Sequence, residues 1–133
     1  MGVVYVCTVH DKYLEDIRPI MRQLYKVIKS HKASFPEALI ANRGDRVKVG
    51  REDPEMAGWY WCQDIKGMEA WIPNTHLDIN GEYAVFNQPY NSIEHTVEVG
   101  EIVQYLGESL DWIECLNKEW KYGWIPTPKL EKI

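Results

Sequence analysis

The chain lacks a long apolar run, a large set of cysteines and an excess of basic residues, and each absence excludes a class of protein. No hydrophobic stretch approaches the roughly 18 residues of a membrane span. The three cysteines cannot all pair, and Cys62 and Cys115 are expected to be small buried hydrophobes in a reducing compartment. With 15 Lys and Arg against 20 Asp and Glu, the net charge of −5 opposes general binding to nucleic acid, whose affinity comes mainly from neutralised phosphates.

Signals of catalysis, metal binding and secretion are also missing. No Ser or Cys has a base at motif spacing and no glycine-rich phosphate loop occurs, so we predict neither enzymatic activity nor a cofactor. Cys7 and His10 form a single C-x-x-H without a second pair, so no metal site is predicted. The first residues carry no charged leader, which predicts a cytoplasmic protein.

The sequence does contain an internal repeat. A set of matched residues recurs 53 positions later (59 to 112, 71 to 124), with Trp59, Cys62, Trp71, Pro73 and Leu77 answered by Trp112, Cys115, Trp124, Pro126 and Leu130. A repeat of this kind indicates one small fold made twice. We therefore predict two domains at residues 25–79 and 80–133, preceded by an extension at residues 1–24.

Each repeat has the pattern of a small β-domain. Short runs that alternate or are rich in aromatic residues are separated by Gly, Asn and Pro turns, which predicts a mainly β protein with two tandem five-stranded closed barrels. Within the extension, residues 3–9 are typical of a strand, and apolar residues then recur at helical spacing. This strand–helix piece could pack on the first barrel, or it could be an exchanged or oligomer-forming arm.

The repeats resemble the Src-homology-3 (SH3) domain, in the variant form found in prokaryotes. The resemblance covers residues 25–133. It rests on a Gly-Asp or Gly-Glu turn, a Trp strand, and a Trp-x-Pro motif before a final apolar residue. In the first repeat these features lie at positions 44–45, 59–62, 70–73 and 77, and in the second at 100–101, 112–115, 123–126 and 130. It implies a non-catalytic module that binds an extended, proline-containing peptide in an aromatic groove.

The family pattern also implies which residues form each groove. In the first repeat these are Lys29, His31, Trp59, Pro73 and His76. In the second they are Phe86, Tyr90, Trp112, Pro126 and Lys129. The two histidines replace tyrosines and are expected beside Trp59, where their titration near neutral pH would make binding pH-dependent.

Charge and composition leave other functions open. Residues 80–133 hold 4 Lys and Arg against 9 Asp and Glu, which favours basic partners for the second groove. Because neither groove has the full aromatic set, a structural scaffold or self-association protein with unused grooves is one alternative. A nucleic-acid-binding barrel is a less favoured alternative. It is supported by three tryptophans that could stack on bases, Trp59, Trp61 and Trp112, and by five basic residues, Lys29, Lys32, Arg43, Arg46 and Lys48.

Overall fold

The computed structural model describes residues 23–133. Within this range the chain forms β-strands and two single-turn 3-10 helices and no α-helix, so the prediction of a mainly β protein is confirmed. The strand and helix predicted in the N-terminal extension, and the oligomer contact suggested for it, fall almost entirely on residues 1–22, outside the described part of the chain. None of the described helices is long and apolar enough to cross a membrane.

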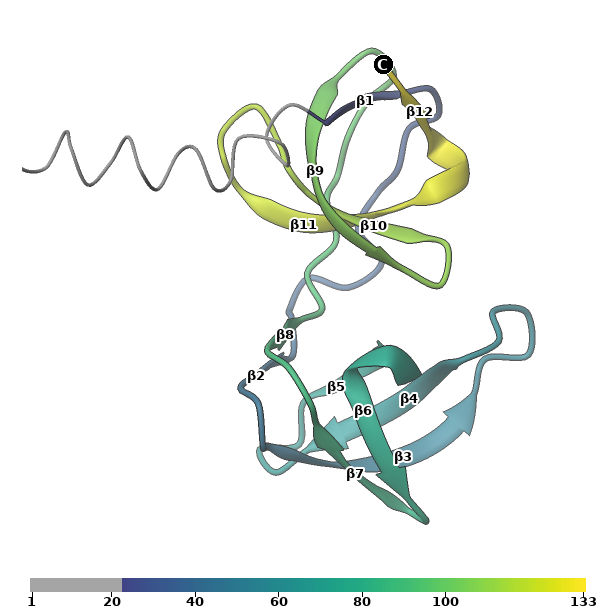
Figure 1. Ribbon diagram of the computed structural model, residues 1–133, viewed down its shortest axis with the longest axis vertical. Coiled ribbons are helices and arrows are strands. Elements are labelled where there is room, and N and C mark those ends of the chain that lie inside the picture. Colours follow the sequence, from purple (N-terminus) through teal and green to yellow (C-terminus); the bar gives the residue numbers. More distant parts are fainter. Residues whose placement is uncertain (1–22) are drawn as a thin grey trace, which may run out of the picture.

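Two five-stranded antiparallel sheets, stacked one above the other, make up most of the structure (Figure 1). Sheet I has the order β5-β4-β3-β7-β6, with η1 (Asn74–His76) between β5 and β6. Its strands are β3 (Arg46–Glu52), β4 (Trp59–Asp64), β5 (Glu69–Pro73), β6 (Leu77–Asn80) and β7 (Tyr83–Phe86). We call this part of the chain unit I.

Sheet II has the order β11-β10-β9-β1-β12, with η2 (Thr127–Lys129) between β11 and β12. Its strands are β1 (Leu24–Val27), β9 (Ile102–Ser109), β10 (Trp112–Leu116), β11 (Tyr122–Pro126) and β12 (Leu130–Lys132). We call this part unit II. The two sheets have the same strand order, with β1 in sheet II at the place that β7 occupies in sheet I.

The two units exchange their first strands. β1 opens the first repeat, yet it lies in sheet II between β9 and β12, where Lys26 pairs with Ile102 and Glu131. β7 belongs to the second repeat but pairs with β3 and β6 of sheet I. Asn80 and Tyr83 are paired, so β6 and β7 are joined by a two-residue turn whose Gly81 has φ 67°. This short turn folds β7 straight back onto β6, and the corresponding place in sheet II is taken by β1.

Two antiparallel segments cross between the units. Strap A (residues 28–45) leads from β1 to β3 and contains β2 (Ile40–Ala41), and strap B (residues 87–101) leads from β7 to β9 and contains β8 (Tyr90–Asn91). The straps pair near unit I through β2 and β8, and near unit II through a bridge between His31 and Val97. They lie side by side at the waist of the molecule (Figure 1).

Neither sheet closes into a barrel, so the prediction of closed barrels is wrong. β5 and β6 are the two edges of sheet I, and β11 and β12 are the edges of sheet II. A 3-10 turn carries the chain from one edge strand to the other in each unit, in place of a hydrogen-bonded ladder. Strap B covers the β11 edge, where His95 N donates to Trp124 O at 3.0 Å.

Each sheet packs its own apolar core. In unit II the core includes Val27 of the exchanged β1 together with Ile113, Cys115 and Ile125. In unit I it consists of residues from sheet I and the straps together with Trp124 of unit II: Leu39, Ala41, Val47, Cys62, Ala70, Ile72, Leu77, Ala84, Phe86, Tyr90 and Trp124. Cys62 and Cys115 are buried free thiols, as expected, and burial raises the pKa of Cys62 to about 11 and that of Cys115 to about 12.

Candidate functional site: a groove shared by the two units

The tryptophans predicted for two separate grooves lie against each other. Trp59 begins β4 and Trp112 begins β10, and their ring centroids are 5.9 Å apart. Trp59 is only 6% exposed, and its Nε1 donates a hydrogen bond to Leu110 O in the β9–β10 turn at 3.1 Å. The tryptophans predicted for the two grooves therefore meet at the junction of the units.

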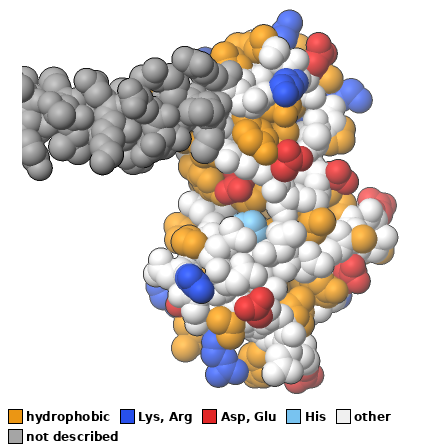
Figure 2. Space-filling view, viewed as in Figure 1, with side chains coloured by type: hydrophobic (Ala, Val, Ile, Leu, Met, Phe, Trp, Pro, Cys, Tyr) orange, Lys and Arg blue, Asp and Glu red, His pale blue; other side chains and the backbone are white. Residues whose placement is uncertain are grey.

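A cavity of about 260 Å³ opens at this junction. Its aromatic lining consists of Phe35, Trp59, Trp71, Tyr90, Trp112 and Trp124. Its acidic lining consists of Glu37, Asp53, Glu69 and Glu94, whereas no Lys, Arg or His lines it. Figure 2 shows acidic side chains around the junction on the face in view. The cavity thus combines flat apolar walls with negative charge, and residues of both units and both straps contribute to it.

Close packing of backbone at Gly58 allows unit II to approach. Gly58 has φ 89°, and a Cβ placed on it would lie 2.7 Å from Leu110 Cδ1. Strand alternation alone would turn Trp59 outward together with Trp61, because Cys62 of the same strand is buried in the core. Trp59 is nevertheless buried, since unit II covers that end of β4.

The back of the cavity is formed by Trp124 and Tyr90. Trp124 is 2% exposed, its Nε1 donates to Asn91 O at 2.8 Å, and its ring centroid lies 6.2 Å from Trp59 and 6.1 Å from Tyr90. Tyr90 Oη donates to Trp71 O at 2.9 Å, and burial raises its pKa far above the ordinary value. Both polar ring groups are therefore bonded to backbone, which fixes the two rings in place.

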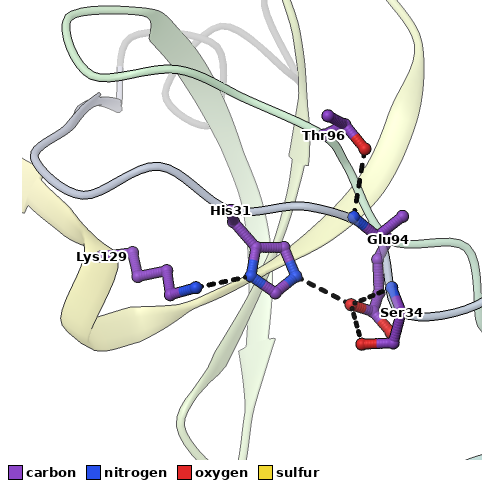
Figure 3. A network of polar contacts seen from close by, with 6 residues as sticks. His31, Ser34, Glu94, Thr96 and Lys129 are labelled. Carbon is purple, nitrogen blue, oxygen red and sulfur yellow. Dashed lines mark hydrogen bonds and ion pairs between the residues drawn. The ribbon is translucent and has the colours of Figure 1, made fainter.

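His31 connects the two straps to η2 at the wall of the groove (Figure 3). Its Nδ1 accepts a hydrogen bond from Lys129 Nζ and its Nε2 donates to Glu94 Oε1, both at 2.8 Å. An ammonium group can only donate, so Nδ1 must be the unprotonated nitrogen of this contact. The backbone N–H and hydroxyl of Ser34 also donate to Glu94 Oε1, and the imidazole ring packs edge-on against Trp112 at 5.6 Å.

His76 lies in η1 and packs against Tyr90 and Trp124. It is buried, its Nδ1 is within 3.1 Å of Thr75 Oγ1, and its ring contacts Tyr90 and Trp124 at 5.1 and 6.1 Å. Burial lowers the pKa of His76, an effect that the negative charge of Glu114 partly opposes. Neither His31 nor His76 lines the cavity itself; each supports an aromatic residue that does.

The structure thus brings some of the predicted site residues together and separates others. Trp59, Tyr90 and Trp112 line the cavity. Five more support it, with Pro73 paired to Trp59, Pro126 paired to Trp112, and His31, His76 and Lys129 in the contacts described above. Phe86 is in the core of unit I, stacked on Tyr90 at 5.9 Å, and Lys29 is exposed on strap A.

Several lining residues were not singled out from the sequence. Phe35, Glu37 and Glu94 lie on the straps, which have almost no regular secondary structure and so no periodic signal. Asn80-Gly81 was the available clue, because this pair marks a tight hairpin. A tight hairpin at the joint between the repeats implies that β7 stays with unit I and that both straps pass through the junction.

Comparison with known families matches part of the chain. Residues 24–79 match the family model described as the variant SH3 domain, so a variant SH3 domain is found in this stretch of the chain. The search of solved structures found no significant match. The matched residues are contiguous in sequence but contribute to both sheets, because β1 lies in sheet II and β3 to β6 lie in sheet I.

Proposed function

We propose that this protein is a non-catalytic interaction module in which tandem SH3-like units form one shared groove for an extended peptide of a partner protein. SH3 domains generally bind peptide or protein ligands, and residues 24–79 match a variant of that domain. The observation that carries the proposal is the cavity of about 260 Å³ at which Trp59 and Trp112 meet. We further propose a cytoplasmic location, which is supported by the two free, buried cysteines.

The aromatic walls suit proline. A polyproline-II segment enters a groove already ordered and so loses little conformational entropy on binding. Trp59 and Trp124 have their indole N–H groups bonded to Leu110 O and Asn91 O, so the flat walls are held without a ligand. A preorganised site of this kind reduces the entropic cost of association.

The charge of the lining favours a ligand with Arg or Lys beside its prolines. Four carboxylates line the cavity without a basic residue among the lining. Glu94 is bonded to His31 and Ser34, and Glu69 accepts from Trp61 Nε1 at 3.2 Å. Glu37 is exposed and makes no side-chain hydrogen bond among the described residues, so it is the carboxylate best placed to pair with an incoming cation.

His31 supports the groove through Trp112 and does not line it. Its Nδ1 accepts a hydrogen bond from Lys129 Nζ, and its ring packs edge-on against Trp112 at 5.6 Å. We expect His31→Ala to weaken peptide binding because Trp112 loses this support, as measured by titration.

Isothermal titration of the whole chain with a short Pro-x-x-Pro peptide flanked by arginines tests the proposal. We expect one peptide per chain, and Glu37→Gln should weaken binding by about threefold, the loss of one exposed charge pair. Glu131→Gln, an exposed carboxylate at the far end of unit II, is the matched control and should bind as the wild type does. Two peptides per chain would contradict the shared groove, and no binding would favour the alternative of a structural scaffold.

A further inference from the structure

The outer face of sheet I carries basic and aromatic side chains, and it adjoins the groove at Glu69 and Trp71. Arg46 and Lys48 of β3 alternate with buried Val47 and so point away from the core. They pair in register with Val85 and Tyr83 of β7, which are also exposed. Arg46 Cζ lies 5.1 Å from the centroid of the Tyr83 ring. Basic and aromatic side chains are therefore interleaved across two neighbouring strands.

A β-bulge adds a third basic side chain to this face. The register of β3 against β4 shifts by one residue between Val49 and Glu52. A Cβ on Gly50 would lie 2.6 Å from Trp61 O, so the bulge requires glycine there. The bulge directs Arg51 over two rings at once, with Cζ 5.8 Å from the centroid of Trp61 and 5.2 Å from that of Trp71.

None of these three cations has an acidic partner. Among residues 23–133, no Lys or Arg nitrogen lies within 4.0 Å of a carboxylate oxygen, and the one contact of this length to a carboxylate is that of His31 with Glu94. Arg46 and Arg51 are held in place by aromatic rings, which orient a guanidinium without occupying its N–H groups. Figure 2 shows Lys and Arg side chains among hydrophobic ones on the lower part of unit I. Positioned but unneutralised cations of this kind are suited to an anionic ligand.

We propose that the outer face of sheet I is a second binding site, for single-stranded nucleic acid. Tyr83, which does not line the groove, is 48% exposed, and Phe35, which lines the groove and also packs on Trp61 at 5.6 Å, is 47% exposed, so flat rings lie beside the basic groups. Stacking of bases on aromatic rings, combined with phosphate contacts to Arg and Lys, is the usual mode of single-strand binding. An acidic peptide would supply the charge but would leave the rings without a stacking partner.

The net charge of −5 limits this binding to low ionic strength. Three phosphate contacts predict a slope of log affinity against log salt concentration of about −2, at about −0.7 per contact for single strands. Fluorescence anisotropy of a labelled oligothymidine of about 15 nucleotides, titrated with the intact chain, measures this slope.

The variant Lys48→Gln should reduce the magnitude of the salt slope by about 0.7. Trp61→Leu, which removes a stacking ring that does not line the groove, should weaken binding about tenfold.

The controls separate this site from non-specific attraction. Lys118→Gln removes one exposed charge from the β10–β11 turn of unit II and should leave the affinity and its salt slope unchanged. Inorganic polyphosphate should compete poorly, because it carries phosphates but no bases. The proposal is overturned if the wild type does not bind at low salt, if Lys118→Gln weakens binding as much as Lys48→Gln, or if polyphosphate or polyglutamate competes as well as unlabelled oligothymidine. Because Lys48 is exposed, its variant keeps the test decisive even if Trp61→Leu disturbs folding.

Discussion

Units I and II have the same strand order and equivalent core positions, yet their corresponding tryptophans have different environments. Trp71 of β5 is half-buried on the outer face of sheet I, beneath Arg51. Trp124, at the same position of β11, is 2% exposed and packs in the core of unit I. The motif is the same in both repeats, but only Trp124 lies where the other unit covers it. Contacts between repeats, more than the motif itself, therefore decide which member of a repeated pair is structural.

The residue before each of these tryptophans shows the same difference. Ala70 precedes Trp71, whereas Gly123 precedes Trp124. A Cβ on Gly123 would lie 2.8 to 2.9 Å from the ring of His95 in strap B. The His95 ring is buried, and its Nε2 is 3.0 Å from Cys115 O, a carbonyl that can only accept, so this nitrogen carries the proton. The glycine thus makes room for a buried histidine that unit I lacks at this position.

The strand exchange gives the largest, all-or-none prediction. Lys26 of β1 faces Glu131 of β12 in the structure, whereas without exchange it would face Asp78 of β6. Directly opposed residues of an antiparallel pair are close enough for a disulfide. In a background without Cys7, we expect the double variant Lys26→Cys, Glu131→Cys to form an intrachain disulfide under oxidation. Its matched control, Lys26→Cys with Asp78→Cys, should stay reduced, as measured by gel mobility and mass spectrometry. The opposite pattern would show that each repeat keeps its own first strand.

The two tryptophans give the next largest effect. Trp124→Ala should lower the free energy of unfolding by about 3–5 kcal/mol, because it leaves a cavity in the core of unit I. Trp71→Ala should cost about 1 kcal/mol, since that side chain is only half-buried. Urea denaturation followed by circular dichroism measures both values. Equal losses would mean that the two tryptophans are equivalent after all.

The buried histidines predict a smaller effect that depends on pH. Burial lowers the pKa of both His76 and His95 below the ordinary value of 6.5. The unfolded chain therefore binds protons more readily than the folded one, so stability is constant above that pH and decreases as the pH falls below it. The slope should be at most about 1.4 kcal/mol per pH unit for each histidine. His95→Gln should reduce the slope measured by urea denaturation between neutral and acidic pH, and an unchanged slope would contradict this assignment.

Much of the fold was predictable from the repeat alone. The constant offset between Trp59 and Trp112 indicated two equivalent β-units, and the structure contains two sheets of the same strand order. Alternation in β4 assigned Cys62 to the core. These features depend on local pattern, which the sequence displays directly. The division into residues 25–79 and 80–133 describes the repeats, while the sheets follow the exchanged strands.

The site was less predictable because it depends on the exchange. His31 was expected beside Trp59, but strap A starts at β1 in sheet II, so His31 lies near unit II and packs on Trp112. Phe86 was expected in a groove, but β7 stays in sheet I and places this residue in the core. Trp59 is buried because it contacts the other unit, and the local sequence pattern does not predict such a contact. Only the Asn80-Gly81 pair indicated the connection that produces these placements.

The shared groove is tested most directly by a nitrogen–proton NMR titration of the intact chain with the arginine-flanked Pro-x-x-Pro peptide. Indole signals can be assigned by substituting Trp59 and Trp112 in turn with Phe. Because the two rings meet in one cavity, we predict that both indole signals shift along a single binding curve with one affinity. Two curves with different affinities, or a shift of only one of the two signals, would contradict a single groove formed by both units.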